Sequence, residues 1–202
     1  MDWISSLSDS IWHWLLSVRR DQHPGQFRFC QKGNIFEPSS TTGLFTSSFA
    51  LKIGYQINKV GEVEEADLKE WTEYIRSFQT GPDGRFSGLF EDKEILKYAD
   101  KSAGLLGLFR KEDVATRRAE TRQACAALLG AGASPKWPVL AIPNSPKEVE
   151  RYIDSLPWRR NPWRAGSHTS HLVFFLKLNA DFFNHEETFN ETLKRPGYNG
   201  GN

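Results

Sequence analysis

The sequence predicts an all-α fold made of antiparallel helical hairpins. Apolar residues recur at spacings of three and four along most of the chain, and helix-capping signals followed by Gly or Pro bound these stretches. Strand-like alternation is confined to QFRFC at 26–30. Since 202 residues with 39% hydrophobic content can bury a core, we expect a single helical domain over 1–202.

The first expected element is an amphipathic helix over 1–20. Its polar face holds serines and aspartates rather than lysines, which favours packing on the core over lying on a membrane surface. Residues 21–43 are rich in Gly, Pro, Ser and Thr and indicate a long connection. The apolar stripe of the helix is Trp3, Ile4, Leu7, Ile11, Trp14, Leu15 and Val18.

Helical hairpins are expected over 44–194. A helix at 44–59 and a second one reaching Phe78 are joined by few residues, which makes them antiparallel neighbours. Further helices are predicted from Asp113 to Gly130, from a capping box at Ser145, from Ser167, and from Asn184 to Lys194. Residues 195–202 are mostly helix breakers and predict a flexible tail.

Composition argues against several functional classes. The 26 basic and 25 acidic residues nearly cancel, so a nucleic-acid partner is not expected. Two distant cysteines do not resemble a disulfide framework, and no apolar run reaches the roughly 20 residues of a transmembrane helix. The N-terminal segment lacks signal-peptide character, so a cytoplasmic location is expected. No nucleotide-binding or hydrolase motif is present, and no cofactor is predicted.

The segment FQTGPDGRFSGLF resembles the repeat turns of the α/α toroids, a superfold of terpenoid cyclases, protein prenyltransferases and polysaccharide lyases. Gln79 precedes Gly84 and Phe86, as a glutamine precedes a glycine–aromatic pair in those turns. The resemblance covers roughly 44–194 and implies that Gln79 links successive helix ends while Gly84 adopts a positive φ.

Departures from the toroid pattern limit what it implies. The glutamine-to-glycine spacing is one residue longer than in the usual cyclase turn, and the DxDD and DxC motifs of cyclases and prenyltransferases are missing. The chain also holds about half the hairpins of a closed ring. It therefore fits a shortened relative of a toroid enzyme, an inactive one, or a non-catalytic helical interaction module.

The densest group of potentially functional side chains lies at 158–171. The cluster combines rings that can stack on a sugar or a prenyl chain, arginines that suit an acid, and two histidines three residues apart. We predict ligand binding by Trp158, Arg160, Trp163 and Arg164, and catalytic roles for Asn161, His168 and His171.

Read as an enzyme site, Asn161 and an arginine would neutralise a uronate while His168 or His171 exchanges a proton. The ligand would be an acidic glycan or a prenyl-type molecule. A metal site needs a third ligand, such as Glu120 or Cys125, and no metal is predicted. In the structural alternative, Asn161–Pro162 is a turn, Trp158 and Trp163 are core anchors, and the histidines are ordinary hydrogen-bonded groups.

Two further expectations concern surfaces. The charged residues Arg117, Arg118, Glu120 and Arg122 indicate a solvated helix face with local ion pairs. An open helical array leaves apolar flanks uncovered, notably at Val173 to Leu176, so we expect self-association through the C-terminal helices.

Overall fold

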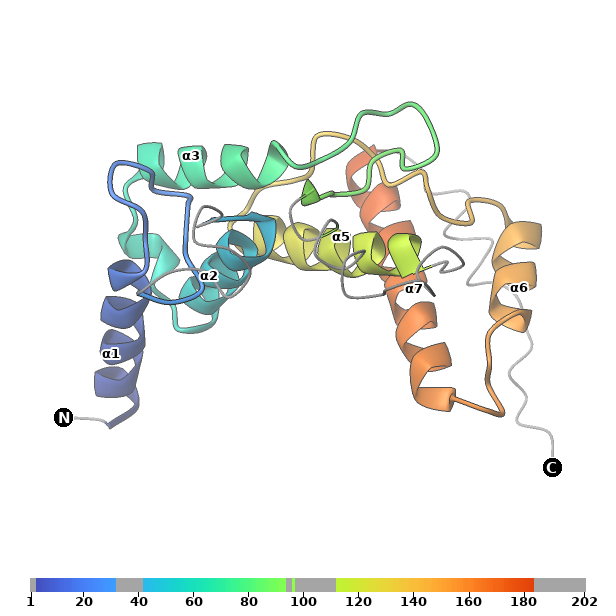
Figure 1. Ribbon diagram of the computed structural model, residues 1–202, viewed down its shortest axis with the longest axis horizontal. Helices are drawn as coiled ribbons and strands as arrows, with labels where there is room; N and C mark the ends of the chain where they lie inside the picture. Colours follow the sequence, from blue (N-terminus) through green and yellow to red (C-terminus); the bar gives the residue numbers. More distant parts are fainter. Residues whose placement is uncertain (1–2, 32–41, 94–95, 97–111, 184–202) are drawn as a thin grey trace. The chain divides into compact units, whose positions relative to one another are not determined.

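The computed structural model describes residues 3–31, 42–93, 96 and 112–183. Within these ranges all regular structure is helical, which confirms the all-α class (Figure 1). Two isolated antiparallel bridges, Arg19 with Phe27 and Gln79 with Phe90, are the β-type pairing of this part of the chain. The elements are α1 (Trp3–Ser17), α2 (Leu44–Gln56), the 3-10 turn η1 (Val60–Glu62), α3 (Glu65–Arg76), α5 (Glu112–Gly130), α6 (Pro146–Asp154) and α7 (Pro162–Phe183).

Most helix boundaries agree with the sequence prediction, but the start of α7 does not. The expected cap was Ser167, whereas the helix begins at Pro162, and the Asn161 Oδ1 accepts a hydrogen bond from the Arg164 N–H at 2.9 Å. Asparagine at the cap with proline in the first turn is a strong helix start, and this cap lies six residues upstream of Ser167. The predicted helix at 184–194 and the tail at 195–202 lie outside the described residues.

The chain divides into two compact units where the sequence predicts one domain. Unit 1 comprises residues 1–79 and 90–136, and unit 2 comprises 80–89 and 137–202. Unit 1 therefore contains α1 to α5, and unit 2 contains α6, α7 and two loop segments.

In unit 1, Ser47 on α2 joins three segments. Its carbonyl accepts a hydrogen bond from the Trp71 indole N–H at 3.1 Å, and its hydroxyl accepts one from the Phe27 N–H at 3.4 Å. The Phe27 and Trp71 rings stack with centroids 4.5 Å apart. All three residues are buried, so the 18–31 loop, α2 and α3 share one core.

Residues 90–92 link α2 to α5 within unit 1. The Phe90 N–H donates to the Thr121 hydroxyl of α5 at 2.9 Å, and the Asp92 carboxylate accepts from the Leu44 N–H at 3.0 Å. A Cβ at Gly43 would lie 2.5 Å from that carboxylate, so glycine leaves room for it. Asp92 thus caps a helix that begins 48 residues earlier.

The resemblance to toroid turns predicts two local features, and both are present. The Gln79 Oε1 accepts a hydrogen bond from the Lys136 N–H at 2.8 Å, which ties the end of α3 to the chain beyond α5 within unit 1. In unit 2, Gly84 has φ +92°. These features agree with a helix-linking turn, while the toroid relationship itself stays a prediction.

Unit 2 is built around the extended segment at Val139. The buried Asn179 side chain of α7 accepts from the Val139 N–H and donates to the Val139 carbonyl, both at 2.9 Å. On the loop side, a Cβ at Gly88 would lie 1.9 Å from the Pro138 oxygen, and Gly88 has φ +75°. Only glycine fits this approach. Of the apolar flank that was expected to be uncovered, Phe175 and Leu176 are buried, whereas Val173 is 42% exposed.

We predict that Asn179→Ala lowers the free energy of unfolding by about 3 kcal/mol, because it leaves a buried N–H and a buried carbonyl of Val139 without their partner. Urea denaturation measures the change. Ser170→Ala on the exposed side of the same helix is the control and is expected to have little effect. Equal effects of the two substitutions would contradict the role given to Asn179.

The start of α6 gives a second prediction. The Ser145 hydroxyl accepts from the Glu148 N–H at 3.4 Å, and the Glu148 carboxylate accepts from the Asn144 N–H at 3.1 Å. Ser145→Ala is expected to cost about 1 kcal/mol of stability through loss of this cap. An unchanged thermal midpoint would show that the cap has no energetic role.

Candidate functional site

The predicted cluster at 158–171 runs from the end of α6 into the first half of α7, within unit 2. Residues 159–164 are all exposed, and Trp163 retains 88% of its accessible surface. An open depression of about 400 Å³ is lined by Trp163 and by residues one and two turns further along α7. The lining residues are Pro162, Trp163, Gly166, Ser167 and Ser170.

The two predicted tryptophans have different roles. The Trp158 indole N–H donates to the Ile153 carbonyl at 2.8 Å, and its ring is half-buried, so it anchors the turn between α6 and α7. Trp163 offers a whole ring to solvent, and its interpretation as a core anchor is therefore wrong. Arg160 and Arg164 lie within three residues of Trp163 in the sequence, and both are exposed.

The residues predicted to be catalytic are spread along α7. Asn161 lies at the helix start and uses its Oδ1 to cap it. His168 and His171 follow seven and ten residues later, about 10 and 15 Å along the axis. His168 Nδ1 lies 2.9 Å from the Tyr152 hydroxyl of α6, so the structure brings His168 to a tyrosine rather than to Asn161. The catalytic roles stay predictions.

No group of three or more His, Cys, Asp or Glu side chains within the described ranges has an arrangement that could hold a metal ion. Cys125 is completely buried on α5, and burial raises the pKa of its thiol. A buried neutral thiol is a poor metal ligand and a poor nucleophile.

The predicted solvated face of α5 is wrong for two of its charged residues. Arg117 and Glu120 on α5 are buried, although the run of charges indicated a solvated face. The Arg117 Nε lies 3.3 Å from the Glu91 carboxylate. Neither carboxylate oxygen of Glu120 has a hydrogen bond of normal geometry to the described part of the chain. The sequence pattern indicated exposure because Arg and Glu are rarely buried in proteins.

Burial raises the pKa of Glu120 to about 8, and the negative charge of Asp92 adds to the rise. The Asp92 backbone and the Arg117 guanidinium oppose it with smaller effects. A carboxyl group in this state is neutral at physiological pH and can donate a proton. Perturbed carboxyls occur at functional sites and in structural networks alike, and this one lies close to Asp92, whose carboxylate caps α2.

Glu120 leads to a prediction about pH. The unfolded chain ionises this group near 4.5, whereas the folded state keeps the proton to about 8. Because the unfolded state binds fewer protons in this window, the free energy of unfolding falls as pH rises through it and stays lower above it. In the parent chain the free energy of unfolding should fall by a few kcal/mol across this window. Glu120→Gln should abolish this fall, so the variant should be more stable than the parent at pH 9.

Urea denaturation at pH 5, 7 and 9 measures this dependence, and Glu70→Gln, an exposed change on α3, is the control. Parallel pH profiles of the parent chain and Glu120→Gln would show that the carboxyl titrates normally.

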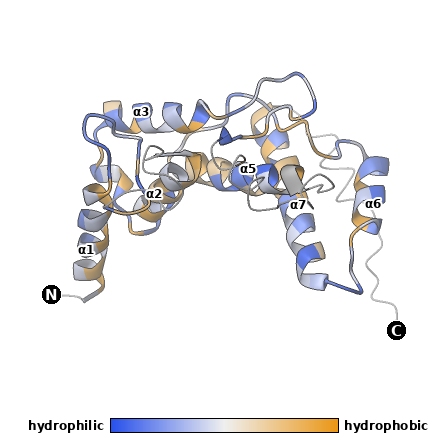
Figure 2. Ribbon diagram, in the orientation of Figure 1, coloured by the Kyte–Doolittle hydropathy of each residue, from blue (hydrophilic) through white to orange (hydrophobic). Residues whose placement is uncertain are grey.

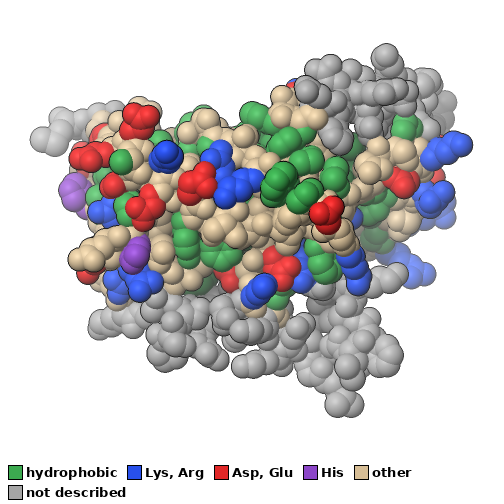
Figure 3. All heavy atoms as spheres, turned by 90° about the horizontal axis from the view of Figure 1, so that it is seen from above, with side chains coloured by type: hydrophobic (Ala, Val, Ile, Leu, Met, Phe, Trp, Pro, Cys, Tyr) green, Lys and Arg blue, Asp and Glu red, His purple; other side chains and the backbone are tan. Residues whose placement is uncertain are grey.

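Comparison with protein-family models, with curated proteins and with solved structures finds no match. Among the described helices, none combines the length and the apolar character needed to cross a bilayer. Figure 3 shows acidic and basic side chains next to one another over much of the visible face, with Lys and Arg side chains in the majority at its right edge. The functional argument therefore depends on local geometry.

Proposed function

We propose that the surface formed by residues 159–164 binds an acidic glycan. The observation that carries the proposal is the exposure of the Trp163 ring, at 88%, among three exposed arginines at the start of a 22-residue helix. The ring would stack on the apolar face of a sugar, and Arg160 and Arg164 would pair with its carboxylate.

The arrangement favours this ligand for two reasons. Guanidinium groups match carboxylates with two parallel hydrogen bonds, and the positive end of the α7 dipole adds to their attraction for an anion. The depression beside Trp163 is open and its other lining residues are small or polar, whereas a prenyl chain requires an enclosed apolar pocket. An acidic sugar is therefore favoured over the prenyl-type ligand.

The proposal assigns binding to this surface rather than catalysis. The Oδ1 of Asn161 already accepts a hydrogen bond from the Arg164 N–H. His168 lies about two turns further along α7 and is hydrogen-bonded to Tyr152 of α6. Proton exchange by His168 or His171 needs a ligand that extends along α7 from Trp163. A relationship to toroid lyases would provide such chemistry, and it too remains a proposal.

The test is calorimetric titration with short oligogalacturonides, with neutral maltooligosaccharides as the comparison ligand. We expect Trp163→Ala and Arg164→Gln each to weaken binding by about tenfold, since a stacking ring and a paired guanidinium carry most of the contact. The matched control is Trp137→Ala, which removes a tryptophan of unit 2 that is 42% exposed and lies outside the proposed surface.

Binding should also weaken as salt is raised, because the arginine–carboxylate pairs are exposed. Equal affinity of the parent chain and Trp163→Ala for the acidic oligosaccharide would show that the Trp163 ring does not contribute to binding. Failure of the parent chain to bind the acidic oligosaccharide, or equal binding of the neutral one, would overturn the proposal.

A further inference from the structure

The N-terminal helix exposes an apolar face. Trp3 is 71% exposed, Ile4 55%, Leu7 48% and Trp14 51%, although the sequence pattern predicted that this stripe packs on the core. The buried residues of α1 lie near its C-terminal end, at Trp12 and Leu15. Figure 2 shows hydrophobic residues along the length of α1. The helix is thus anchored at one end, while the apolar side chains of its first two turns are exposed to solvent.

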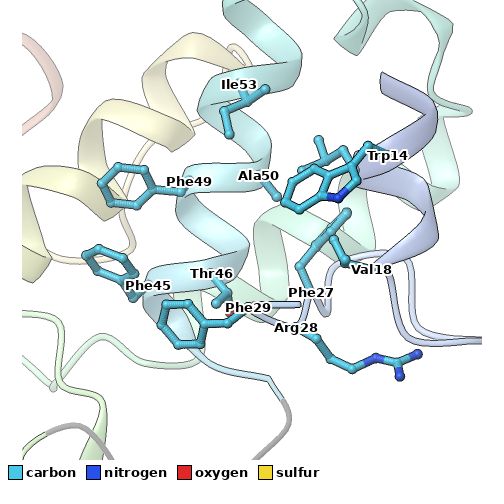
Figure 4. Close-up of a pocket in the computed structure, with 11 residues that line it drawn as sticks. Trp14, Val18, Phe27, Arg28, Phe29, Phe45, Thr46, Phe49, Ala50 and Ile53 are labelled. Atoms are coloured by element: carbon cyan, nitrogen blue, oxygen red, sulfur yellow. The ribbon is translucent and has the colours of Figure 1, made fainter. Parts of the chain in front are cut away.

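The same face contains a cavity at its anchored end. The space of about 160 Å³ lies between α1, α2 and the 18–31 loop and is lined almost entirely by apolar atoms. Phe45, Phe49 and Ile53 line it from successive turns of α2, while the Arg28 guanidinium points away from it (Figure 4). An apolar cavity of about 150 Å³ is large enough for one benzene-sized group.

Burying this helix face would leave no charge of α1 without a partner. Asp9 is the only charged residue between Trp3 and Ser17, and its carboxylate already lies 2.8 Å from the Lys59 ammonium. The Ser10 hydroxyl donates to the Ser6 carbonyl at 2.8 Å, and His13 Nδ1 lies 2.7 Å from the Asp9 carbonyl. Much of the usual desolvation cost of a polar helix surface is therefore absent.

We propose that a second copy of this chain covers the exposed face of α1 by antiparallel pairing of the two α1 helices. Trp3 and Trp14 are eleven residues apart, about 16 Å along the axis, so Trp3 cannot reach the cavity of its own chain. In an antiparallel pair, the start of each helix lies against the end of the other. Trp3 or Ile4 of each copy then fills the cavity of its partner.

The observations favour a second copy over other occupants because one face holds both the projecting side chains and the cavity that fits them. Such self-complementarity is the requirement of a two-fold interface. A membrane surface is disfavoured because α1 has no lysine or arginine to meet anionic lipid. The contact is limited to a helix about 22 Å long and the adjoining cavity, so a weak dimer is expected.

Sedimentation velocity of the full chain between about 5 and 200 µM tests the proposal, with a concentration-dependent change from monomer to dimer expected. Leu7→Glu should raise the dimer dissociation constant at least about tenfold, because it places like charges near the two-fold axis. Ser5→Glu adds the same charge to the same exposed helix on its other side and should change it less than about twofold.

Circular dichroism and thermal melting establish that both variants fold, as their exposed positions predict. A monomer at all concentrations, or a dimer equally sensitive or equally insensitive to the two substitutions, overturns the proposal. So does binding of the chain to anionic phospholipid vesicles that Leu7→Glu abolishes, since that result would place the face on a membrane.

Discussion

The Asp92 carboxylate at the start of α2 is the interaction on which unit 1 depends. It accepts the Leu44 N–H in a buried position, where an unsatisfied helix terminus would be costly. The preceding residues attach the same segment to α5 through Thr121 and Arg117. One short stretch of chain therefore fixes the helix pair against which α1, α3 and the 18–31 loop pack.

This arrangement explains why charged residues lie inside the protein. A carboxylate buried to cap α2 lies close to Glu120, and its charge disfavours a second ionised acid beside it. Burial is the main reason that the pKa of Glu120 is raised, and the Asp92 charge adds to it, so Glu120 keeps its proton while Arg117 pairs with Glu91 in the same region. The pH dependence of stability follows from this burial beside the carboxylate that caps α2 and does not require a catalytic role.

The two proposals concern separate surfaces and can fail separately. The glycan surface lies at the exposed start of α7 in unit 2, and the dimer surface lies on α1 in unit 1. Both begin with tryptophans that the structure leaves exposed. Apolar periodicity indicated a place in the core for Trp3 and Trp14, and a core anchor was one of the two interpretations of Trp163. A large ring in water at the end of a rigid helix is a typical contact for a ligand or a partner.

The sequence by itself determined the helical class, the approximate positions of the described helices apart from the start of α7, and the cap of α6, because backbone periodicity and capping are local properties of neighbouring residues. It also identified Gln79 and Gly84 as turn residues. The burial of Arg117 and Glu120, the two hydrogen bonds of Asn179 with Val139 and the exposure of Trp3 were decided by the tertiary structure. Each of these depends on residues distant in the chain, so no local pattern of hydrophobicity or charge could predict them.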